Sequence, residues 1–463
     1  MNQSNSNNVN EQESVKGITR ISVSGYKSLY DECSIEVRPL TILAGANSSG
    51  KSSIMQPLLL MKQTLEATYD PGALLLDGPN IKFTSAEQVF SKVSGQKHNN
   101  QFIVSIGIEN NQSIENKFIK YPRKSLEIIE MIHEKDDKKI VLSPEILPGD
   151  IKDILPEIYS EIEQTLKNLE ELKNTSIYWI IDRNRCFLNF YLVINGYKMN
   201  EIFPLLNPVH NTLYPSHSEI FGNYIRKIIH LPGLRGNPER NYKTTAIGDE
   251  FPGTFDNYVA SIINHWQKPR DKRLQELANL LENLGLTCKV HAKQVNDTQV
   301  ELRVGRLPRN SDAKDDMVNI ADVGFGVSQT LPVLVALLVA KPGQLVYIEQ
   351  PEIHLHPRAQ VAMAEILANA AKRGVKVVIE THSDRLILAI QSLVAEGNLS
   401  PDLVKLHWFT RQDDGITRVN SADLDETGAF GDWPEDFGDI SLQLENRYLS
   451  AAEARLMQGI HGG

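Results

Sequence analysis

The chain has 463 residues, of which 41% are hydrophobic and 23% are charged. This composition excludes a chain that is disordered throughout and allows two or three ordinary domains, or one large domain with an insertion. The formal net charge of −10 excludes a uniformly basic protein that coats nucleic acid, although a local basic surface is compatible with it.

Residues 1–16 are rich in Asn, Ser, Gln and Glu and show no apolar periodicity, which is typical of a flexible tail. They do not form a charged and then apolar leader, and the longest apolar run, residues 331–340, is about half the length of a bilayer-spanning helix. Three distant cysteines without a CxxC pair indicate neither a disulfide framework nor a cysteine zinc site. We expect a soluble, cytoplasmic protein with no membrane partner.

Short apolar segments from Ile18 onward predict strands over residues 18–29, 33–39 and 40–43. The last of these runs directly into a glycine-containing loop, and a helix is predicted over residues 54–66.

Residues 85–310 are polar and irregular, which indicates an insertion, and they include one helical stripe, that is, apolar residues spaced so that they share one face of a helix. Apolar residues recur there at spacings of three and four, at Ile151, Ile154, Leu155, Ile158, Ile162, Leu166, Leu169 and Leu172. This stripe indicates either ordinary core packing or a helix that binds a partner or dimerises. A second amphipathic helix, predicted over residues 271–284, leaves the same alternatives open.

The C-terminal third alternates between strands and helices. Strands are predicted over residues 345–349, 375–380 and 403–409, and helices over 357–374 and 383–397. Such alternation predicts an α/β fold with a mostly parallel sheet that is covered by helices.

Charge is distributed unevenly along the chain. Residues 226–309 hold 14 Lys and Arg against 9 Asp and Glu (14 − 9 = +5), whereas residues 413–463 hold 3 against 11 (3 − 11 = −8). The two segments are either solvated faces, or a basic surface for nucleic acid and an acidic region that regulates it or docks a partner.

Residues 45–52, GANSSGKS, fit the P-loop pattern between a predicted strand and a predicted helix. In this motif glycines turn backbone N–H groups toward phosphate, Lys51 reaches the terminal phosphates, and the Ser52 hydroxyl ligates Mg²⁺. The sequence therefore predicts binding of ATP and Mg²⁺ by Gly45, Asn47, Ser48, Ser49, Gly50, Lys51, Ser52 and Ser53.

A P-loop site also needs an acidic group at the end of a neighbouring strand. Glu349 closes the apolar segment 345–348 and is the candidate metal-side residue, 349 − 51 = 298 residues after the P-loop lysine. His382 follows the next predicted strand and is the candidate sensor of the γ-phosphate, although a lone histidine in a loop is more often structural. A long insertion must therefore separate the two halves of one site.

Together these segments resemble the ABC-type ATPases of the SMC-like and OLD class, over residues 18–63 and 315–410. Residues 348–357, IEQPEIHLHP, are similar to the Walker B block of that class, 380–383 to its switch-histidine segment, and 322–329 to its signature segment. Residues 231–240 and 431–434 resemble segments of bacterial ATPases in phage-defence operons, among them the ATPase subunits of Septu systems.

The resemblance implies a P-loop NTPase fold, with an ABC-type ATPase head interrupted by a helical insertion. The implied parts are a tail (1–16), an N-terminal ATPase lobe (17–84), a helical insertion (85–310), a C-terminal ATPase lobe (311–412) and an acidic region (413–463). It also implies a head-to-tail homodimer or higher oligomer, in which Gly326 and Ser328 contact the nucleotide of the partner. Glycine at 324, where the class usually has serine, leaves the contributed hydroxyl in doubt unless Ser328 supplies it.

Other polar residues near these motifs have open roles. His354 and His356 fit turn packing or a dimer contact better than a metal site, and Arg235 and Arg240 could reach phosphate or pair with acids. Gln350 stands where the class most often has the glutamate that polarises the attacking water. Because an amide can orient water but cannot accept its proton, we expect slow ATP hydrolysis unless Glu352 or Glu380 acts as the base.

Two functions remain open, and a third is disfavoured. The first is an ATPase of anti-phage defence or repair that controls a nuclease on another chain, of HNH type in the Septu comparison, with nucleic acid reached through the complex. No nuclease pattern is recognised in this sequence, and the acidic pair Asp423 and Asp425 indicates a surface loop. The second is an SMC-like repair or recombination ATPase that clamps DNA directly. A transporter subunit is disfavoured by the insertion and the atypical signature.

Overall fold

The computed structural model describes residues 17–93, 99–123, 125–136, 138–154, 176–198, 217–307, 316–431 and 446–451. The expected N-terminal tail lies outside these residues, and so does the part of the helical stripe that follows Ile154. Within them, no helix combines the length and apolar character needed to cross a bilayer.

A six-stranded sheet forms the centre of the molecule, in the order β11-β16-β17-β3-β18-β19. Its strands are β11 (Ile229–Leu231), β16 (Leu345–Glu349), β17 (Lys376–Thr381), β3 (Leu40–Gly45), β18 (Val404–Arg411) and β19 (Thr417–Ala422). The first five run parallel and β19 is antiparallel to β18. The mostly parallel α/β sheet predicted from the alternating C-terminal segments is therefore confirmed.

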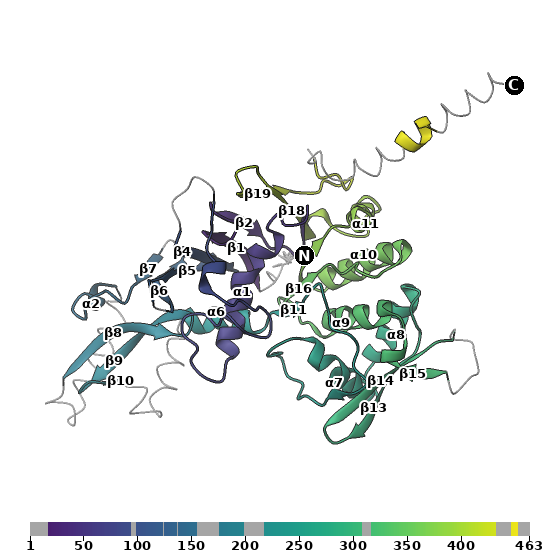
Figure 1. Cartoon of the computed structure of the whole chain (residues 1–463), viewed down its shortest axis with the longest axis horizontal. Coiled ribbons are helices and arrows are strands. Elements are labelled where there is room, and N and C mark those ends of the chain that lie inside the picture. Colours follow the sequence, from purple (N-terminus) through teal and green to yellow (C-terminus); the bar gives the residue numbers. More distant parts are fainter. Residues whose placement is uncertain are drawn as a thin grey trace, which may run out of the picture.

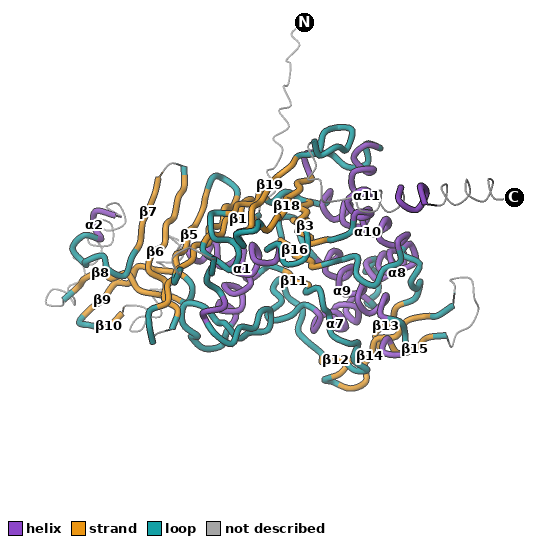
Figure 2. The backbone as a smooth tube through the Cα atoms, turned by 45° about the horizontal axis from the view of Figure 1, so that its top comes forward, coloured by secondary structure: helices purple, strands orange, loops and turns teal. Residues whose placement is uncertain are grey.

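Helices cover one face of this sheet (Figures 1 and 2). Side chains from alternate positions of β3, β16 and β17, including Ile42, Ile348 and Ile379, join a core with these helices. The helices are α7 (Asp256–Trp266), α8 (Arg273–Asn283), α9 (Phe325–Val339), α10 (Pro357–Lys372) and α11 (Asp384–Ala395). Because Leu277 and Leu281 of α8 are buried in this core, the second predicted amphipathic helix packs within the chain.

The opposite face packs against α1 (Lys51–Glu66) and a second, antiparallel sheet. That sheet has the order β2-β1-β4-β5-β6-β7. Its strands are β1 (Ile18–Ser24), β2 (Cys33–Glu36), β4 (Gln101–Ile108), β5 (Gln112–Lys120), β6 (Leu126–Lys135) and β7 (Lys138–Leu142). Short α2 (Ile151–Ile154), α6 (His217–Arg226) and the hairpin of β8 (Ile177–Asn184) and β9 (Phe187–Ile194) with β10 (Tyr197–Lys198) lie on the same side of the molecule (Figure 1).

A smaller sheet lies beside α7 and consists of β12 (Tyr242–Lys243), β13 (Val290–Asn296), β14 (Gln299–Gly305) and β15 (Met317–Asn319). The 3-10 turns are η1 (Ala86–Gln88), η3 (Ile320–Asp322) and η4 (Pro401–Leu403). The described part of residues 85–310 therefore contains many strands as well as helices, and is not the mainly helical insertion that the periodic stripe suggested. The reason is that polar and apolar residues alternate in β4 and β5, which pair in the sheet of β1.

Strand pairing also crosses the expected domain boundaries. Strand β4 pairs with β1, β11 pairs with β16, and β19 pairs with β18. The segment between the two ATPase lobes thus completes both main sheets, and the start of the acidic region adds an edge strand. These pairings join residues that are far apart in the chain, which short-range patterns do not record.

Candidate functional site

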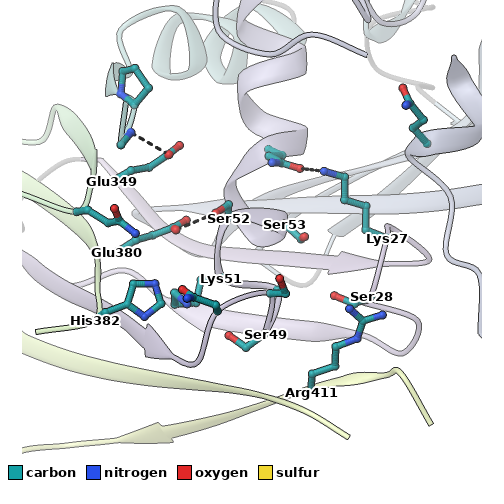
Figure 3. Close-up of a pocket in the computed structure, with 18 of the residues that line it drawn as sticks. Lys27, Ser28, Ser49, Lys51, Ser52, Ser53, Glu349, Glu380, His382 and Arg411 are labelled. Carbon is teal, nitrogen blue, oxygen red and sulfur yellow. Dashed lines mark hydrogen bonds between the residues drawn. The ribbon is translucent and has the colours of Figure 1, made fainter. Parts of the chain in front are cut away.

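A cavity of about 1130 Å³ opens at the carboxyl ends of the parallel strands. Its walls come from the P-loop, the first turns of α1, the turn after β1, the loop after β11 and the ends of β16, β17 and β18 (Figure 3). The carboxyl edge of a parallel sheet is the usual place for a ligand in α/β proteins. The structure thus brings Lys51, Glu349 and His382 to one cavity, as the sequence predicts.

Glycines and one left-handed serine shape the P-loop. Gly45, Ser48 and Gly50 have φ of 141°, 61° and 102°. A Cβ atom at Gly45 would lie 2.3 Å from the Phe409 carbonyl oxygen, and one at Gly50 would lie 2.6 Å from Thr417 Oγ1. The loop therefore lies directly against β18 and β19 in a conformation that only glycine tolerates at both positions.

Lys51 lies in the first turn of α1 and is almost fully buried. Its Nζ donates hydrogen bonds to the carbonyl oxygens of Gly45 at 2.9 Å and Ala46 at 2.7 Å. Burial lowers the pKa of Lys51, although the charges of Glu380 and Glu352 oppose this shift. The ammonium is held within its own loop, among the other predicted phosphate-binding residues Asn47, Ser48, Ser49, Gly50, Ser52 and Ser53, which all line the cavity.

Ser52 contacts Glu380, an acid that the sequence indicates only as a possible base. The Ser52 hydroxyl donates a hydrogen bond of 2.8 Å to Glu380 Oε2 (Figure 3). The Tyr347 hydroxyl donates to Glu380 Oε1. Burial raises the pKa of Glu380 to about 7, and the nearby charge of Glu349 adds to that rise. The apolar strand that carries Glu380 near its end gives the same signal that singled out Glu349, so the sequence marks both acids but does not decide between them.

Glu349 reaches the cavity from the end of β16 but faces the edge of the sheet. Its Oε1 lies 3.1 Å from His230 Nε2, and its Oε2 accepts a 3.0 Å hydrogen bond from the Gly233 N–H. The His230 ring stacks on Tyr347 with a centroid distance of 5.2 Å. Burial acts to raise the pKa of Glu349, but the hydrogen bonds from His230 and Gly233 outweigh it and lower this pKa.

Gln350 lines the cavity in a left-handed conformation with φ of 47°. Its N–H donates to the Glu380 carbonyl oxygen at 2.8 Å, which holds the turn after β16 against β17. A residue other than glycine in this region of backbone space is uncommon, and such strain concentrates at functional sites. The structure thus presents the amide of Gln350 to the cavity from a turn whose backbone is held in place.

Arg235 is buried behind this turn and not among the residues that line the cavity. Its guanidinium donates to the carbonyl oxygens of Gln329 at 3.1 Å and Glu349 at 3.0 Å, and the Gln329 amide donates back to the Arg235 carbonyl. Arg235 therefore ties the end of β16 to α9. Arg240 forms an exposed ion pair with Asp322 at 2.7 Å, which resolves the open choice in favour of pairing with an acid.

His382 follows β17 and lines the cavity beside Lys51. Burial lowers the pKa of His382, and the charge of Lys51 adds to this effect. Glu352 Oε1 accepts hydrogen bonds from the Thr381 hydroxyl at 2.7 Å and from the His382 N–H at 3.0 Å. Glu352 thus fixes the histidine loop, and both carboxylates considered as alternative bases already have hydrogen-bonding partners.

The signature segment does not line this cavity. Gly326 and Ser328 lie in the first turn of α9, where the Ser328 hydroxyl donates to the Phe325 carbonyl at 3.1 Å. Phe325 is 53% exposed and lies near the His354 ring, with a centroid distance of 5.9 Å, while His356 Nδ1 accepts from the Arg358 N–H at the start of α10. These contacts place His354 and His356 in turn and helix-start packing. Within the described residues, no cluster of three or more His, Cys, Asp or Glu side chains is arranged to hold a metal ion.

The other end of the cavity was not predicted from the sequence. Lys27, Ser28, Gln56 and Arg411 line it, and Lys27 Nζ donates to Gln56 Oε1 at 2.6 Å. Ser28 also accepts a 2.8 Å hydrogen bond from the Thr417 hydroxyl. These residues belong to no motif and come together only through the pairing of distant strands, so no sequence pattern indicates them.

The residues present fit Mg²⁺ bound together with a triphosphate. The donor set near Ser52 consists of hydroxyl and carboxylate oxygens, which this hard cation prefers, and Mg²⁺ is usually held by one or two protein groups plus phosphate oxygens. Bound there, the ion would neutralise charge on the phosphates. Around the same cavity the chain places the Lys51 side chain, the P-loop backbone and the His382 side chain.

Comparisons with known proteins give one family match and several distant structural similarities. The family model described as AAA ATPase domain matches residues 17–387. No curated protein matches the sequence. Solved structures that it resembles include an Smc head bound to the C-winged helix domain of ScpA (TM-score 0.44, 12% identity, covering 89% of this chain and 98% of that one) and the SMC head domain from Thermotoga maritima (TM-score 0.35, 10% identity, 87% and 98%). A third is the Smc head domain bound to the C-terminal domain of ScpA derived from Pyrococcus furiosus, with a TM-score of 0.43 and 12% identity over 88% of this chain and 96% of that one.

The family match spans the P-loop strand, the intervening segment and the strand ends that carry Glu349 and His382. The chain therefore belongs to the AAA ATPase domain family, and is an ATP-binding P-loop ATPase.

Proposed function

We propose that this protein is a slow, cytoplasmic ATPase that forms a head-to-tail dimer on ATP and Mg²⁺ and regulates a partner nuclease in anti-phage defence. Lys51, Ser52 and the strand-end acids hold the nucleotide, and His382 senses its γ-phosphate. In each site Gly326 and Ser328 of a second copy close over the nucleotide, which then acts as part of the interface.

One observation carries the dimer proposal. The cavity contains the P-loop, Gln350 and His382, but the signature residues Gly326 and Ser328 lie outside its walls. Phe325, beside them, is largely exposed at the start of α9. A signature segment that does not reach the nucleotide of its own chain can reach that of a second copy.

Slow turnover rests on Gln350. Its side chain lines the cavity, and the neighbouring acids are engaged, Glu352 by the histidine loop and Glu380 by Ser52 and Tyr347. Without a free carboxylate to accept the proton of the attacking water, ATP serves mainly to hold one conformation.

The nuclease is proposed to lie on a partner, of HNH type by the motif resemblance to Septu systems. The acidic pair that superficially resembles a nuclease motif has structural roles: Asp423 pairs with Lys405 at 2.8 Å, and Asp425 accepts the N–H groups of Thr427 and Ala429. Nucleic acid is then reached through the complex.

The alternative, a clamp that grips DNA directly, receives less support. Several basic residues of the segment 226–309 are paired with acids, as in Arg226–Glu250, Arg240–Asp322, Arg273–Asp271 and Arg303–Glu301. These pairs reduce the positive field that a DNA groove requires.

Gly324→Arg tests the dimer. A Cβ atom at Gly324 meets nothing within 4 Å, so the monomer should fold normally, while the long side chain projects from the start of the signature helix. We expect light scattering to show a dimer of the unmodified protein with Mg²⁺ and a non-hydrolysable ATP analogue, and a monomer of this variant. Gly149→Arg is the matched control, because its Cβ is equally unhindered and lies beyond the antiparallel sheet. Dimerisation of Gly324→Arg equal to that of the control would refute this interface.

A further inference from the structure

We infer that Glu380, and not Glu349, is the carboxylate that works with Ser52 to hold the Mg²⁺ of bound ATP. The inference deepens the proposed function and rests on it. It reverses the assignment that the sequence suggested, in which Glu349 is the metal-side acid.

The contact of Ser52 is the first step. Its hydroxyl is the P-loop group that ligates Mg²⁺, and it donates directly to Glu380 Oε2 at 2.8 Å. Figure 3 shows the Glu380 side chain directed at Ser52, with Glu349 above it and directed toward the loop after β11. An acid already in contact with the metal-binding hydroxyl is placed to share that metal.

Sheet order is the second step. Strand β17 pairs directly with the P-loop strand β3, whereas β16 lies one strand farther away. Glu380 is opposite Leu43 of β3, two residues before the loop begins at Gly45. The end of β17 therefore lies nearer to the P-loop strand than the end of β16 does.

Tyr347 provides the third step. It is completely buried, and its hydroxyl donates to Glu380 Oε1 while Oε2 is directed at Ser52. A hydrogen bond from a rigid neighbour that fixes one oxygen and orients the other is the usual support of a metal-binding carboxylate.

Glu349 has a different set of partners, which is the fourth step. Both of its oxygens face the loop after β11, Oε1 toward His230 and Oε2 toward the Gly233 N–H. The same loop continues into Arg235, which binds the Glu349 carbonyl and α9. Glu349 is therefore a positioning residue that holds the cavity wall at residues 232–234, next to the arginine that ties β16 to the signature helix.

The test compares Glu380→Gln with Glu349→Gln in the full chain. Both substitutions keep the side-chain shape and remove one charge at neighbouring strand ends. Affinity for a fluorescent, non-hydrolysable ATP analogue is measured in EDTA and in Mn²⁺, and the ratio of the two dissociation constants reports how strongly metal and nucleotide binding are coupled. Electron paramagnetic resonance of Mn²⁺ in the ternary complex gives a second readout that is independent of turnover.

We expect Glu380→Gln to bind the analogue normally in EDTA but to lose about tenfold or more of the tightening by Mn²⁺, whereas Glu349→Gln retains it within about threefold. Tyr347→Phe, which keeps the carboxylate but removes the hydroxyl that orients it, should show a partial loss. Normal binding in EDTA also demonstrates that each variant is folded.

Loss of the Mn²⁺ effect in Glu349→Gln alone, or equally in both variants, would overturn the inference. Failure of the unmodified protein to bind the analogue in either condition would instead overturn the proposed function on which the inference rests.

Discussion

Gln350 occupies the strained turn between β16 and α10, with φ of 47° and its N–H bonded to the Glu380 carbonyl. Its backbone is therefore fixed independently of its side chain, which lines the cavity. At this position the difference between an amide and a carboxylate changes the chemistry offered to water without changing the turn.

Gln350→Glu should raise steady-state ATP turnover by about tenfold or more, since general-base catalysis typically contributes 10²–10⁴-fold. Phosphate release is the measurement, and Gln412→Glu, which adds the same charge at an exposed position, is the control. Unchanged turnover in Gln350→Glu would show that the missing carboxylate does not limit hydrolysis.

At the residue scale, one side of the cavity could be predicted from the sequence, because the P-loop, Glu349, Gln350 and His382 each follow an apolar strand or begin a helix. The hydrogen bond between Ser52 and Glu380 could not be predicted. The ends of β16 and β17 each carry a glutamate, and only the order of the strands in the sheet decides which glutamate lies closer to Ser52. Lys27 belongs to no sequence pattern, and the sequence singles out Arg235 without indicating its carbonyl partners, because both roles arise from contacts across the chain.

Strand β18 joins the two main sheets through His407. This residue is fully buried, its Nε2 donates to the Glu36 carbonyl at the end of β2, and its Nδ1 lies 2.7 Å from the Ser421 hydroxyl of β19. Burial lowers the pKa of His407 to about 4, although the hydrogen bond to Glu36 opposes this. The element is therefore anchored by a neutral imidazole.

Lowering the pH should reduce the stability that the neutral His407 side chain gives to the fold. Because the folded pKa of about 4 lies below the unfolded value of 6.5, the unfolded state binds more protons between these limits, and His407 lowers stability as the pH falls through that window. We expect its contribution to reduce the free energy of unfolding by about 2 kcal/mol between pH 7 and pH 5.

Urea unfolding at both pH values measures this effect. His407→Gln can keep both hydrogen bonds but cannot titrate, so its loss of stability over the same range should be smaller by that amount. An identical pH dependence in the two proteins would show that His407 is not responsible.

At the scale of elements, the sequence predicted the strands and helices of the two ATPase lobes well, because apolar runs, Pro357 and Gly374 mark their limits. It did not predict that β4 joins the sheet of β1 or that β11 extends the parallel sheet. Strand β11 is only three residues long, and its buried pattern is too short to distinguish a strand from a loop.

The whole molecule brings together two segments that are separated by nearly 300 residues, because β3 lies between β17 and β18 at the centre of the parallel sheet. The intervening chain returns through β11 and builds one wall of the cavity at residues 232–234. The nucleotide site is thus a product of the global topology, and its proposed completion by a second copy extends that principle to the dimer.

A cryo-EM or crystal structure of the full chain with Mg²⁺ and a non-hydrolysable ATP analogue tests the central claim most directly. The account predicts a triphosphate between Lys51 and His382 of one copy, covered by Gly326 and Ser328 of another. Nucleotide bound away from the Lys51 loop, or bound there without any approach of His382 and the strand-end acids, would contradict it.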